Sequence, residues 1–396
     1  MDRSGERNLK AYGFLEAVTF PGEKSNPRGR INLVLDSIKT EAIETGTAHN
    51  RLAADLLIVR ILTTRGRLEA LFPTVTWEEG EWVELELQDS PGFPRAWFLS
   101  AEANYSGSVV RTNLISATAL SGNPLRPTEV VDKLQELCAP TAAVRIQKQN
   151  ENSPKTRISG PFVRVVDVGH ASFSTVHEGN HIDSKILGYF DVGGPVFFHH
   201  RTFPTKFLEA GRVPASGFVV LSHWDFDHYS LAVSKIPALR SLNWYAPDQP
   251  VGPNAASLQV KLGSRLSLIS APTYWLTPSI HLWKGNGALT DRNGSGYVMT
   301  ITRAGGDVLL SGDVPYSMLP RGVGNKLVGL AVTHHGGSFT GSPPAPLKAG
   351  ATAAVSYGLP NRYHHPHAPS IDLHKTAGWK IAPTYVTAKK RGDIWL

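Results

Sequence analysis

The stretch F-V-V-L-S-H-W-D-F-D-H, residues 218–228, joins a short apolar segment to a polar turn. Its apolar start, residues 218–221, predicts a buried strand. Four side chains of metal-binding type follow: His223, Asp225, Asp227 and His228. Zn²⁺, Mn²⁺ and Fe accept mixed imidazole and carboxylate ligands. Because a turn can direct the first two toward one point and the last two toward another, the stretch predicts one loop of a two-metal site.

A polar turn after a strand often contains Asp or His, so any one of these residues alone would be interpreted as a surface residue. Four residues of ligand type lie between positions 223 and 228, directly after an apolar strand. That density favours the metal site over the plain turn.

Two acidic residues end other predicted strands. Asp313 ends V-L-L-S-G-D, where Gly312 lets the backbone come close and the two carboxylate oxygens could bridge two cations. A simple Asp turn is the alternative. Asp191 ends I-L-G-Y-F-D just before Gly193 and Gly194, a position from which an acid can support metal-binding histidines.

Histidines follow two further predicted strands. His334 and His335 come after the strand at 330–333, and neighbouring side chains on a strand point to opposite faces, so we expect one of the pair to reach the metals. The second group follows the strand at 353–357 and contains His364, His365 and His367. The residues alone leave the choice open at both strand ends.

Together these segments resemble a known family. H-x-D-x-D-H is similar to the metal loop of the metallo-β-lactamase fold, which more often reads H-x-H-x-D-H, so Asp225 stands where that pattern has His. The Asp form resembles the metallo-β-lactamase domain of the competence DNA-uptake protein ComEC and its soluble relatives. Four more segments match in order from about Pro161 to the C-terminus: V-V-D-V-G-H (165–170), L-L-S-G-D (309–313), V-T-H-H-G-G-S (332–338) and N-R-Y-H-H-P-H (361–367).

The resemblance implies an α/β fold, the αββα metallo-β-lactamase sandwich, with two divalent ions, either Mn²⁺ or Zn²⁺, with Mg²⁺ also accepted. The metal ligands that it implies are His223, Asp225, Asp227, His228, Asp313, His334 and His365. Asp227 and His228 would be the catalytic residues, and Asp191, His335 and His367 would support the ligands from behind. Because a carboxylate is a harder ligand than imidazole, Asp225 is expected to shift the preference from Zn²⁺ toward Mn²⁺ or Mg²⁺.

The chain departs from that family in three places. Residues 169–173 read G-H-A-S-F where the group has G-Q-G-D-A, and His364 replaces a usual Gly. No G-H-x-x-G segment lies between His228 and Asp313. His281, the one His in that interval, sits in the alternating segment P-S-I-H-L-W and is expected to be a packed or exposed strand residue and not a ligand.

Patterning divides the chain into three parts. Residues 1–145 predict a small β-rich domain of barrel type, 146–160 a polar linker, and 161–396 the metallo-β-lactamase-like domain. In the first part we expect strands at 31–36, 56–62, 82–87 and 96–99 and a helix at 129–138. In the last part we expect strands at 162–168, 185–191, 218–221, 297–302, 307–310, 330–333 and 353–357, and helices near 231–239 and 370–377.

The composition is that of a globular protein, with 41% hydrophobic and 18% charged residues among 396. The polar start predicts no signal peptide, and the chain contains no apolar run of the roughly 20 residues that cross a bilayer, so we expect no membrane insertion. The single cysteine, Cys138, excludes an intramolecular disulfide and a cysteine-based zinc cluster. We therefore expect a cytoplasmic location.

The net charge of +7 is compatible with a phosphate-rich partner such as nucleic acid. Basic residues flank the start and end of the last part: Lys148, Lys155, Arg157 and Arg164, then Lys389, Lys390 and Arg391. The second of these clusters is equally well interpreted as a solvated hairpin turn.

We expect a metal-dependent phosphodiesterase, in particular a nuclease. The chain contains no G-x-S-x-G elbow, no P-loop and no G-x-G-x-x-G opening a helix, which disfavours serine hydrolase, ATP and dinucleotide chemistry. One alternative is a hydrolase of small esters or phosphoesters. The other is a non-catalytic subunit regulated by a protein partner, which the N-terminal domain would bind.

Overall fold

The computed structural model describes residues 8–19, 29–46, 55–103, 105, 109–120, 128–139, 143–148, 160–195, 201–207, 209–361 and 363–396. They form two compact units. The first comprises Met1–Thr141 and Pro250–Lys261, and the second comprises Ala142–Gln249 and Leu262–Leu396. Most of the predicted linker at 146–160, including Lys155 and Arg157, lies outside the described residues.

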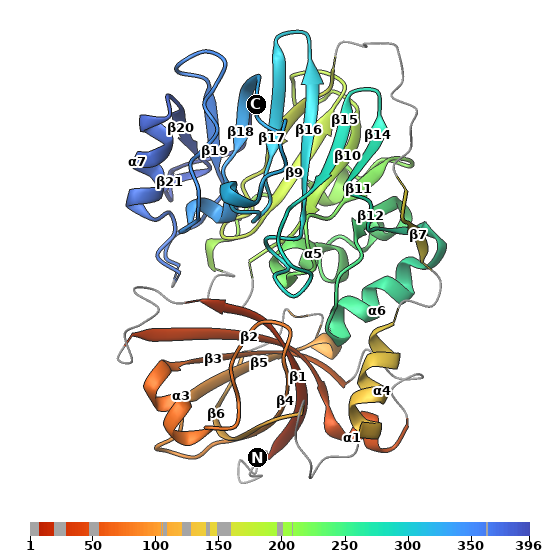
Figure 1. Cartoon of the computed structure of the whole chain (residues 1–396), viewed down its shortest axis with the longest axis vertical. Coiled ribbons are helices and arrows are strands. Elements are labelled where there is room, and N and C mark those ends of the chain that lie inside the picture. Colours follow the sequence, from red (N-terminus) through yellow and green to blue (C-terminus); the bar gives the residue numbers. More distant parts are fainter. Residues whose placement is uncertain are drawn as a thin grey trace. The chain divides into compact units, whose positions relative to one another are not determined.

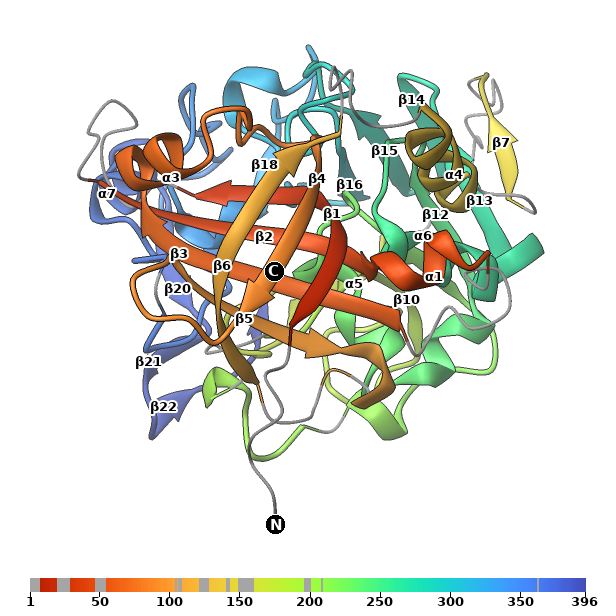
Figure 2. The same cartoon turned by 90° about the horizontal axis from the view of Figure 1, so that it is seen from below.

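The first unit is built on a closed barrel with the strand order β1-β2-β3-β5-β6-β4, which Figure 2 shows from below. Its strands are β1 (Leu9–Thr19), β2 (Arg30–Lys39), β3 (Leu56–Thr64), β4 (Trp82–Gln88), β5 (Arg95–Ser100) and β6 (Val110–Ala119). In β4 every second side chain is buried, because W-V-E-L-E-L-Q alternates apolar and polar residues across the two faces. Three helices accompany the described strands: α1 (Thr40–Glu44), α3 (Arg65–Leu71) and α4 (Thr128–Cys138).

A helix from much later in the chain, α6 (Pro253–Leu262), completes the first unit. The carboxylate of Asp36 on β2, only 1% exposed, accepts hydrogen bonds from the backbone N–H of Asn254 at 2.8 Å and of Ala255 at 3.2 Å. A carboxylate at this position satisfies two otherwise unpaired N–H groups and complements the positive end of the helix dipole. The Asn254 side chain also donates to Asp36 and to the carbonyl oxygen of Leu57.

Two mixed sheets build the second unit (Figure 1). The first sheet has the order β23-β8-β9-β10-β11-β12-β13-β7 and the second has the order β14-β15-β16-β17-β18-β19-β20. The strands of the first sheet are β7 (Val144–Ile146), β8 (Phe162–Val165), β9 (Phe173–His177), β10 (Ile186–Val192), β11 (Phe218–Val220), β12 (Asn243–Pro247), β13 (Leu266–Ile269) and β23 (Ile394–Trp395). Those of the second are β14 (Thr273–Thr277), β15 (Ile280–Lys284), β16 (Tyr297–Arg303), β17 (Gly306–Leu310), β18 (Leu327–Ala331), β19 (Thr352–Val355) and β20 (Lys380–Pro383).

The two sheets share an apolar core, to which Phe190 and Val220 contribute from one sheet and Met299 and Leu310 from the other. Leu309, the neighbour of Leu310, belongs to a second core on the other face of its sheet, because successive strand residues alternate between faces. Helix α7 (Ala368–Thr376) packs against β20, and helix α5 (Phe226–Val233) packs against β10. The unit is therefore α/β and rich in sheet, as predicted. The finer αββα arrangement stays a prediction.

The start of α5 corrects one sequence prediction. The helix expected near 231–239 begins at Phe226 and ends at Val233, and a separate 3₁₀ turn occupies Pro237–Ser241. Pro237 lacks a backbone donor and cannot continue an α-helix. Asp225 keeps an extended backbone immediately before the first turn, so the helix begins inside the metal-binding stretch rather than after it.

A buried ion-pair cluster lies behind β8. Arg164, whose side chain is 1% exposed, contacts Glu209 at 2.6 Å and Asp393 at 3.0 Å. Arg391 donates to Asp167 at 2.6 Å. Arg164, one of the basic residues that flank the start of the last part of the chain, therefore uses its guanidinium inside the fold and not on the surface. Among the described residues, no helix combines the length and the apolar character needed to span a membrane.

Candidate metal centre

The predicted ligands follow strands that pair in parallel. His223 comes after β11, Asp313 after β17, His334 after β18 and His365 after β19. Strands β10 and β11 are parallel neighbours, as are β17, β18 and β19. Because the carboxyl ends of parallel strands meet at one edge of a sheet, each sheet presents its polar residues along one edge.

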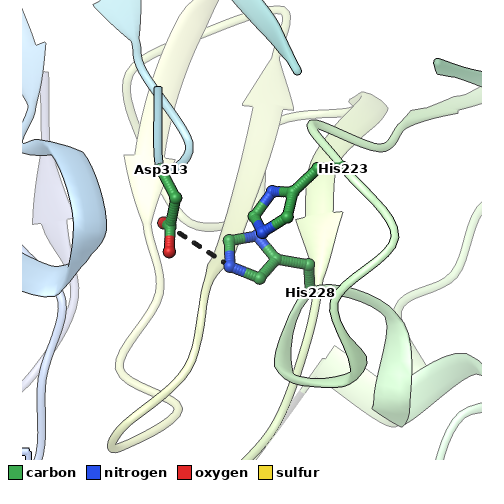
Figure 3. A group of neighbouring side chains, drawn as sticks. All are labelled: His223, His228 and Asp313. Carbon is green, nitrogen blue, oxygen red and sulfur yellow. Dashed lines mark ion pairs between the residues drawn. The ribbon is translucent and has the colours of Figure 1, made fainter. Parts of the chain in front are cut away.

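His228 lies at the middle of the cluster. Its Nε2 atom is 3.5 Å from Oδ1 of Asp313 and 3.8 Å from Oδ1 of Asp227. Figure 3 shows His223 and His228 beside Asp313, with the ion pair between His228 and Asp313 dashed. On the other side, Nε2 of His335 is 3.5 Å from Oδ2 of Asp227. Two groups thus have ligand atoms close enough to share an ion: His223, His228 and Asp313, and Asp227, His228 and His335.

The histidines of these two groups are prepared to bind a cation. The Nε2 atoms of His223, His228 and His335 are buried and have no hydrogen-bond partner among the described residues. A buried nitrogen without a partner is costly unless something else satisfies it. A divalent cation bound by either group would satisfy two of these nitrogens and neutralise the carboxylate beside them, so the residues present fit a metal ion.

Each of these rings is fixed through its other nitrogen. Nδ1 of His335 is 3.1 Å from the carbonyl oxygen of Ser356, which can only accept, so Nδ1 carries the proton. Nδ1 of His228 donates to Oδ2 of Asp191 at 2.8 Å. Nδ1 of His223 donates to Oγ of Ser222 at 3.0 Å, since that hydroxyl itself donates to Asp191. With Nδ1 engaged in these contacts, Nε2 is the nitrogen that each ring directs at a carboxylate.

Asp191 accepts several of the hydrogen bonds that hold these histidines in place. It is fully buried, and it accepts from the backbone N–H of Ser222 at 2.8 Å and from the hydroxyl of Ser172 at 3.0 Å as well as from His228. The glycine that follows is required by close packing, because a Cβ at Gly193 would lie 1.5 Å from the carbonyl oxygen of Asp227. The sequence interpretation of an acid beside glycines that supports the metal loop describes this placement.

We expect Asp191→Asn to weaken divalent-ion binding about 10- to 100-fold, the usual cost of removing a partner behind a metal-binding histidine. The amide oxygen of Asn can still accept the hydrogen bond from Nδ1 of His228. The negative charge that makes the imidazole a stronger metal ligand is lost. Titration calorimetry with Mn²⁺ measures the change. Ser172→Ala removes only one hydrogen bond to the same carboxylate and should change affinity less, so equal effects would contradict a charge-based role.

Protons occupy the cluster when no ion is bound. Burial alone would lower the pKa of His228, but the carboxylates of Asp191 and Asp313 raise it well above its ordinary value. The pKa of Asp313 lies well below its usual range, because the neighbouring His334 and His228 outweigh the effect of burial. Burial lowers the pKa of His335, yet the nearby carboxylates of Asp227 and Asp313 outweigh it and raise the pKa. An incoming cation therefore has to displace protons from His228 and His335.

The two adjacent histidines both reach the cluster. Strand β18 ends at Ala331, and His334 and His335 lie in the following turn with φ of 51° and 54°. The rule that neighbours on a strand point to opposite faces does not apply to this left-handed turn. Nε2 of His334 is 3.9 Å from Oδ2 of Asp313, and its side chain is 33% exposed. The structure thus brings His334 beside one carboxylate and His335 beside another.

Of the remaining histidines, one lies beside the metal-ligand cluster and the others have contacts elsewhere. The ring of His365 is buried 5.2 Å from that of His334, and its pKa is well below the ordinary value because of burial and the nearby His334. His367 precedes α7, and its Nδ1 lies 3.2 Å from the hydroxyl of Ser370. His281 lies in β15, as its alternating segment predicted, where its ring stacks on Trp275 and is tilted against Trp283.

Sequence reasoning missed two residues of the cluster. His170 is buried with its ring 5.1 Å from His335 and 5.3 Å from His365. Its only signal was a place in the segment V-V-D-V-G-H. Arg292 forms an ion pair of 2.7 Å with Asp225. No motif pointed to it, since it lies 67 positions from its partner in an unremarkable turn.

Comparisons with known proteins give limited matches. No protein-family model and no curated protein matches this chain. Among solved structures it is similar to the metallo-β-lactamase fold protein YhfI from Bacillus subtilis, with 14% identity, a TM-score of 0.34, and 59% of this chain and 99% of that chain covered. A probable metal-dependent hydrolase from Staphylococcus aureus matches at 12% identity and a TM-score of 0.25 over 40% of this chain and 74% of that one.

A mutant of the β-hydroxylase CmlA matches at 13% identity and a TM-score of 0.28 over 71% of this chain and 57% of that one. The first two of these structures are thus a metallo-β-lactamase fold protein and a probable metal-dependent hydrolase. TM-scores of this size do not assign the present chain to their fold, so its chemistry has to be inferred from its own residues.

Proposed function

We propose that this protein is a metal-dependent phosphodiesterase of the metallo-β-lactamase type, related to the ComEC-like group, and that it cleaves nucleic acid. One observation carries the proposal: among the described residues, the buried Nε2 atoms of His223, His228 and His335 have no hydrogen-bond partner, and those of His228 and His335 face the carboxylates of Asp227 and Asp313. The clustering of these donors at strand ends in an α/β unit supports a catalytic rather than a purely structural role.

Each part of the site has a task. Asp227, His228, His335 and Asp313 would hold a divalent ion, and His223, His334 and His365 are the further predicted ligands. When bound, such an ion lowers the pKa of a water and neutralises the negative charge that develops on a phosphate. Asp191 and Ser222 keep the Nδ1 protons of His228 and His223 in place. The carboxylate of Asp227, 31% exposed, is the acid of the loop that a substrate can approach.

Phosphate chemistry is supported by charge. The chain carries a net charge of +7, which attracts a polyanion. Asp227 and Asp313 supply oxygen ligands of the kind that Mn²⁺ and Mg²⁺ prefer, and these ions are suited to phosphate substrates. A small-molecule (phospho)ester substrate and a non-catalytic, partner-bound subunit are the competing interpretations.

A combined assay tests the proposal. The protein is stripped of metal, supplied with Mn²⁺, Zn²⁺ or Mg²⁺, and assayed on bis-p-nitrophenyl phosphate and on single- and double-stranded DNA and RNA. We expect metal-dependent cleavage of the model diester and of at least one nucleic acid. Cleavage of the model diester alone would favour a small-molecule substrate. A folded protein that binds metal but cleaves nothing would favour the non-catalytic subunit.

Binding of nucleic acid should depend steeply on salt. Phosphate contacts from Lys and Arg release counterions, so raising salt from about 50 to about 200 mM should weaken binding about ten- to a thousandfold for a few contacts. The net charge of +7 motivates this expectation. Fluorescence anisotropy with the Asp227→Ala variant measures affinity without consuming the ligand. Affinity that ignores salt, or no binding of DNA or RNA at low salt, would remove the nuclease proposal.

A further inference from the structure

Asp225 is held differently from the other acids of the loop. Its Oδ1 atom lies 2.7 Å from Nη2 of Arg292, and both side chains are buried, at 11% and 2% exposure. Its other oxygen, Oδ2, lies 3.4 Å from Nε2 of His223. Asp227, two residues later, faces His228 and His335 instead.

The turn between β15 and β16 fixes Arg292 in this position. Its backbone carbonyl accepts a hydrogen bond of 2.8 Å from the side chain of Gln249, which also donates to Ser295 at 2.7 Å. The neighbouring Asp291 caps the turn by accepting from the backbone N–H of Gly294 at 2.8 Å. The backbone N–H of Tyr297 then donates to the carbonyl oxygen of Ser222 at 2.8 Å, which ties the turn to the metal loop. These contacts hold the backbone that carries Arg292 in place before any metal ion binds.

Pairing with Arg292 makes Asp225 a poor metal ligand. A metal ion bound through Asp225 would place a second positive charge on a carboxylate that already compensates the buried guanidinium of Arg292, which is unfavourable. Binding an ion through Oδ2 alone would draw on a carboxylate whose charge is already neutralised. Neither of the two groups with ligand atoms close enough to share an ion includes Asp225, although it lies between His223 and Asp227 in the loop.

The two groups also compete for one atom. Both contain His228, whose Nδ1 is bonded to Asp191, so Nε2 is its one nitrogen available to a metal. An ion bound by Asp227, His228 and His335 uses that nitrogen. The other side then retains His223 and Asp313, and Asp225, whose Oδ2 lies 3.4 Å from Nε2 of His223, is the acid of the loop that could complete this side.

We propose that Arg292 withholds Asp225 from metal coordination, so that the centre binds one divalent ion tightly instead of the two that the sequence predicts. This rests on the metal centre of the proposed function. The Asp225–Arg292 pair then takes the place that a neutral His has in the commoner H-x-H-x-D-H pattern, and the second ion position stays incomplete.

Metal counting tests this directly. Protein stripped with a chelator is saturated with Mn²⁺, freed of unbound ion and analysed for metal per chain. We expect about one Mn²⁺ in the natural chain and about two in Arg292→Met, where Asp225 is released. Arg321→Met, which removes an exposed arginine, is the matched control and should keep one.

Two double variants guard against misfolding of Arg292→Met, which leaves a buried acid without its partner. Asp225→His with Arg292→Met leaves no unpaired charge, provides an imidazole, and should bind two ions. Asp225→Leu with Arg292→Met removes both charges without adding a ligand and should bind one. Circular dichroism confirms that each variant is folded.

Two ions in the natural chain, or one ion in a folded Asp225→His/Arg292→Met variant, would overturn the inference. No ion in the natural chain would overturn it together with the metal centre. Because the count needs no substrate, a protein that shows the expected one-to-two change but cleaves no phosphodiester would refute the proposed function alone.

Discussion

Asp227→Ala is expected to abolish hydrolysis of bis-p-nitrophenyl phosphate, with turnover falling by about a thousandfold or more. Its carboxylate faces Nε2 of both His228 and His335, so its loss removes one ligand and takes a negative charge away from beside both imidazoles. A metal ion contributes several kcal/mol of transition-state stabilisation, and about 4 kcal/mol corresponds to a thousandfold in rate.

Asp227 is a better test than His228. The side chain of Asp227 is 31% exposed, whereas His228 is fully buried and its loss would also leave Asp191 without its imidazole partner. His228→Ala should be equally inactive but less stable. Asp372→Ala, an exposed acid paired with Lys375, is the matched control and should keep full activity. Near-normal turnover by Asp227→Ala in metal-stripped, then Mn²⁺-supplemented buffer would refute the metal mechanism.

The largest effect on stability is expected from Arg164→Met. Glu209, whose side chain is 3% exposed, would lose the guanidinium 2.6 Å away and remain as a buried, weakly compensated acid. Breaking a buried pair from one side costs about 3–5 kcal/mol. Urea unfolding followed by circular dichroism should show a lower midpoint, and hydrogen exchange should show lost protection along β8 and β9.

Two comparisons isolate the cause. Arg212 is 22% exposed and lies 3.3 Å from the same Glu209. Because solvent screens this pair, Arg212→Met should lower the free energy of unfolding far less than Arg164→Met. Arg164→Met combined with Glu209→Leu removes both charges and should recover much of the loss. A double variant no more stable than Arg164→Met would show that the packing of Arg164, which also lies over the Trp395 ring, matters more than its charge.

Local patterns predicted those parts of the site that lie within one short segment. The strand and turn around His223 and Asp227, and the acid at the end of V-L-L-S-G-D, could be inferred because apolar runs and ligand-type residues follow one another directly. The order of residues does not show which side chains converge from distant segments. His170 joins the histidine cluster through packing across the sheets, and no local pattern distinguishes it from a core residue.

Backbone geometry was a second reason why parts of the site could not be predicted from the sequence. His334 and His335 were treated as strand neighbours, but the left-handed turn after Ala331 brings both beside carboxylates. Arg292 could not be recognised because an arginine in a turn is usually exposed, and its burial depends on Asp225 from another part of the chain. The barrel strands β1 and β6 escaped prediction since their segments lack clear alternation between apolar and polar residues.

The placement of α6 has a consequence for how this chain can be divided. In sequence the helix lies between β12 and β13, strands of the second unit, yet its N-terminus is capped by Asp36 of the barrel. The chain therefore leaves the second unit and returns to it, and no single cut separates the two. A fragment that ends near Thr141 would leave Asp36 without its two backbone donors, and a fragment that begins there would carry α6 without the barrel. The barrel is thus not bounded by one continuous N-terminal segment, because its compact unit includes residues more than 100 positions further along the chain.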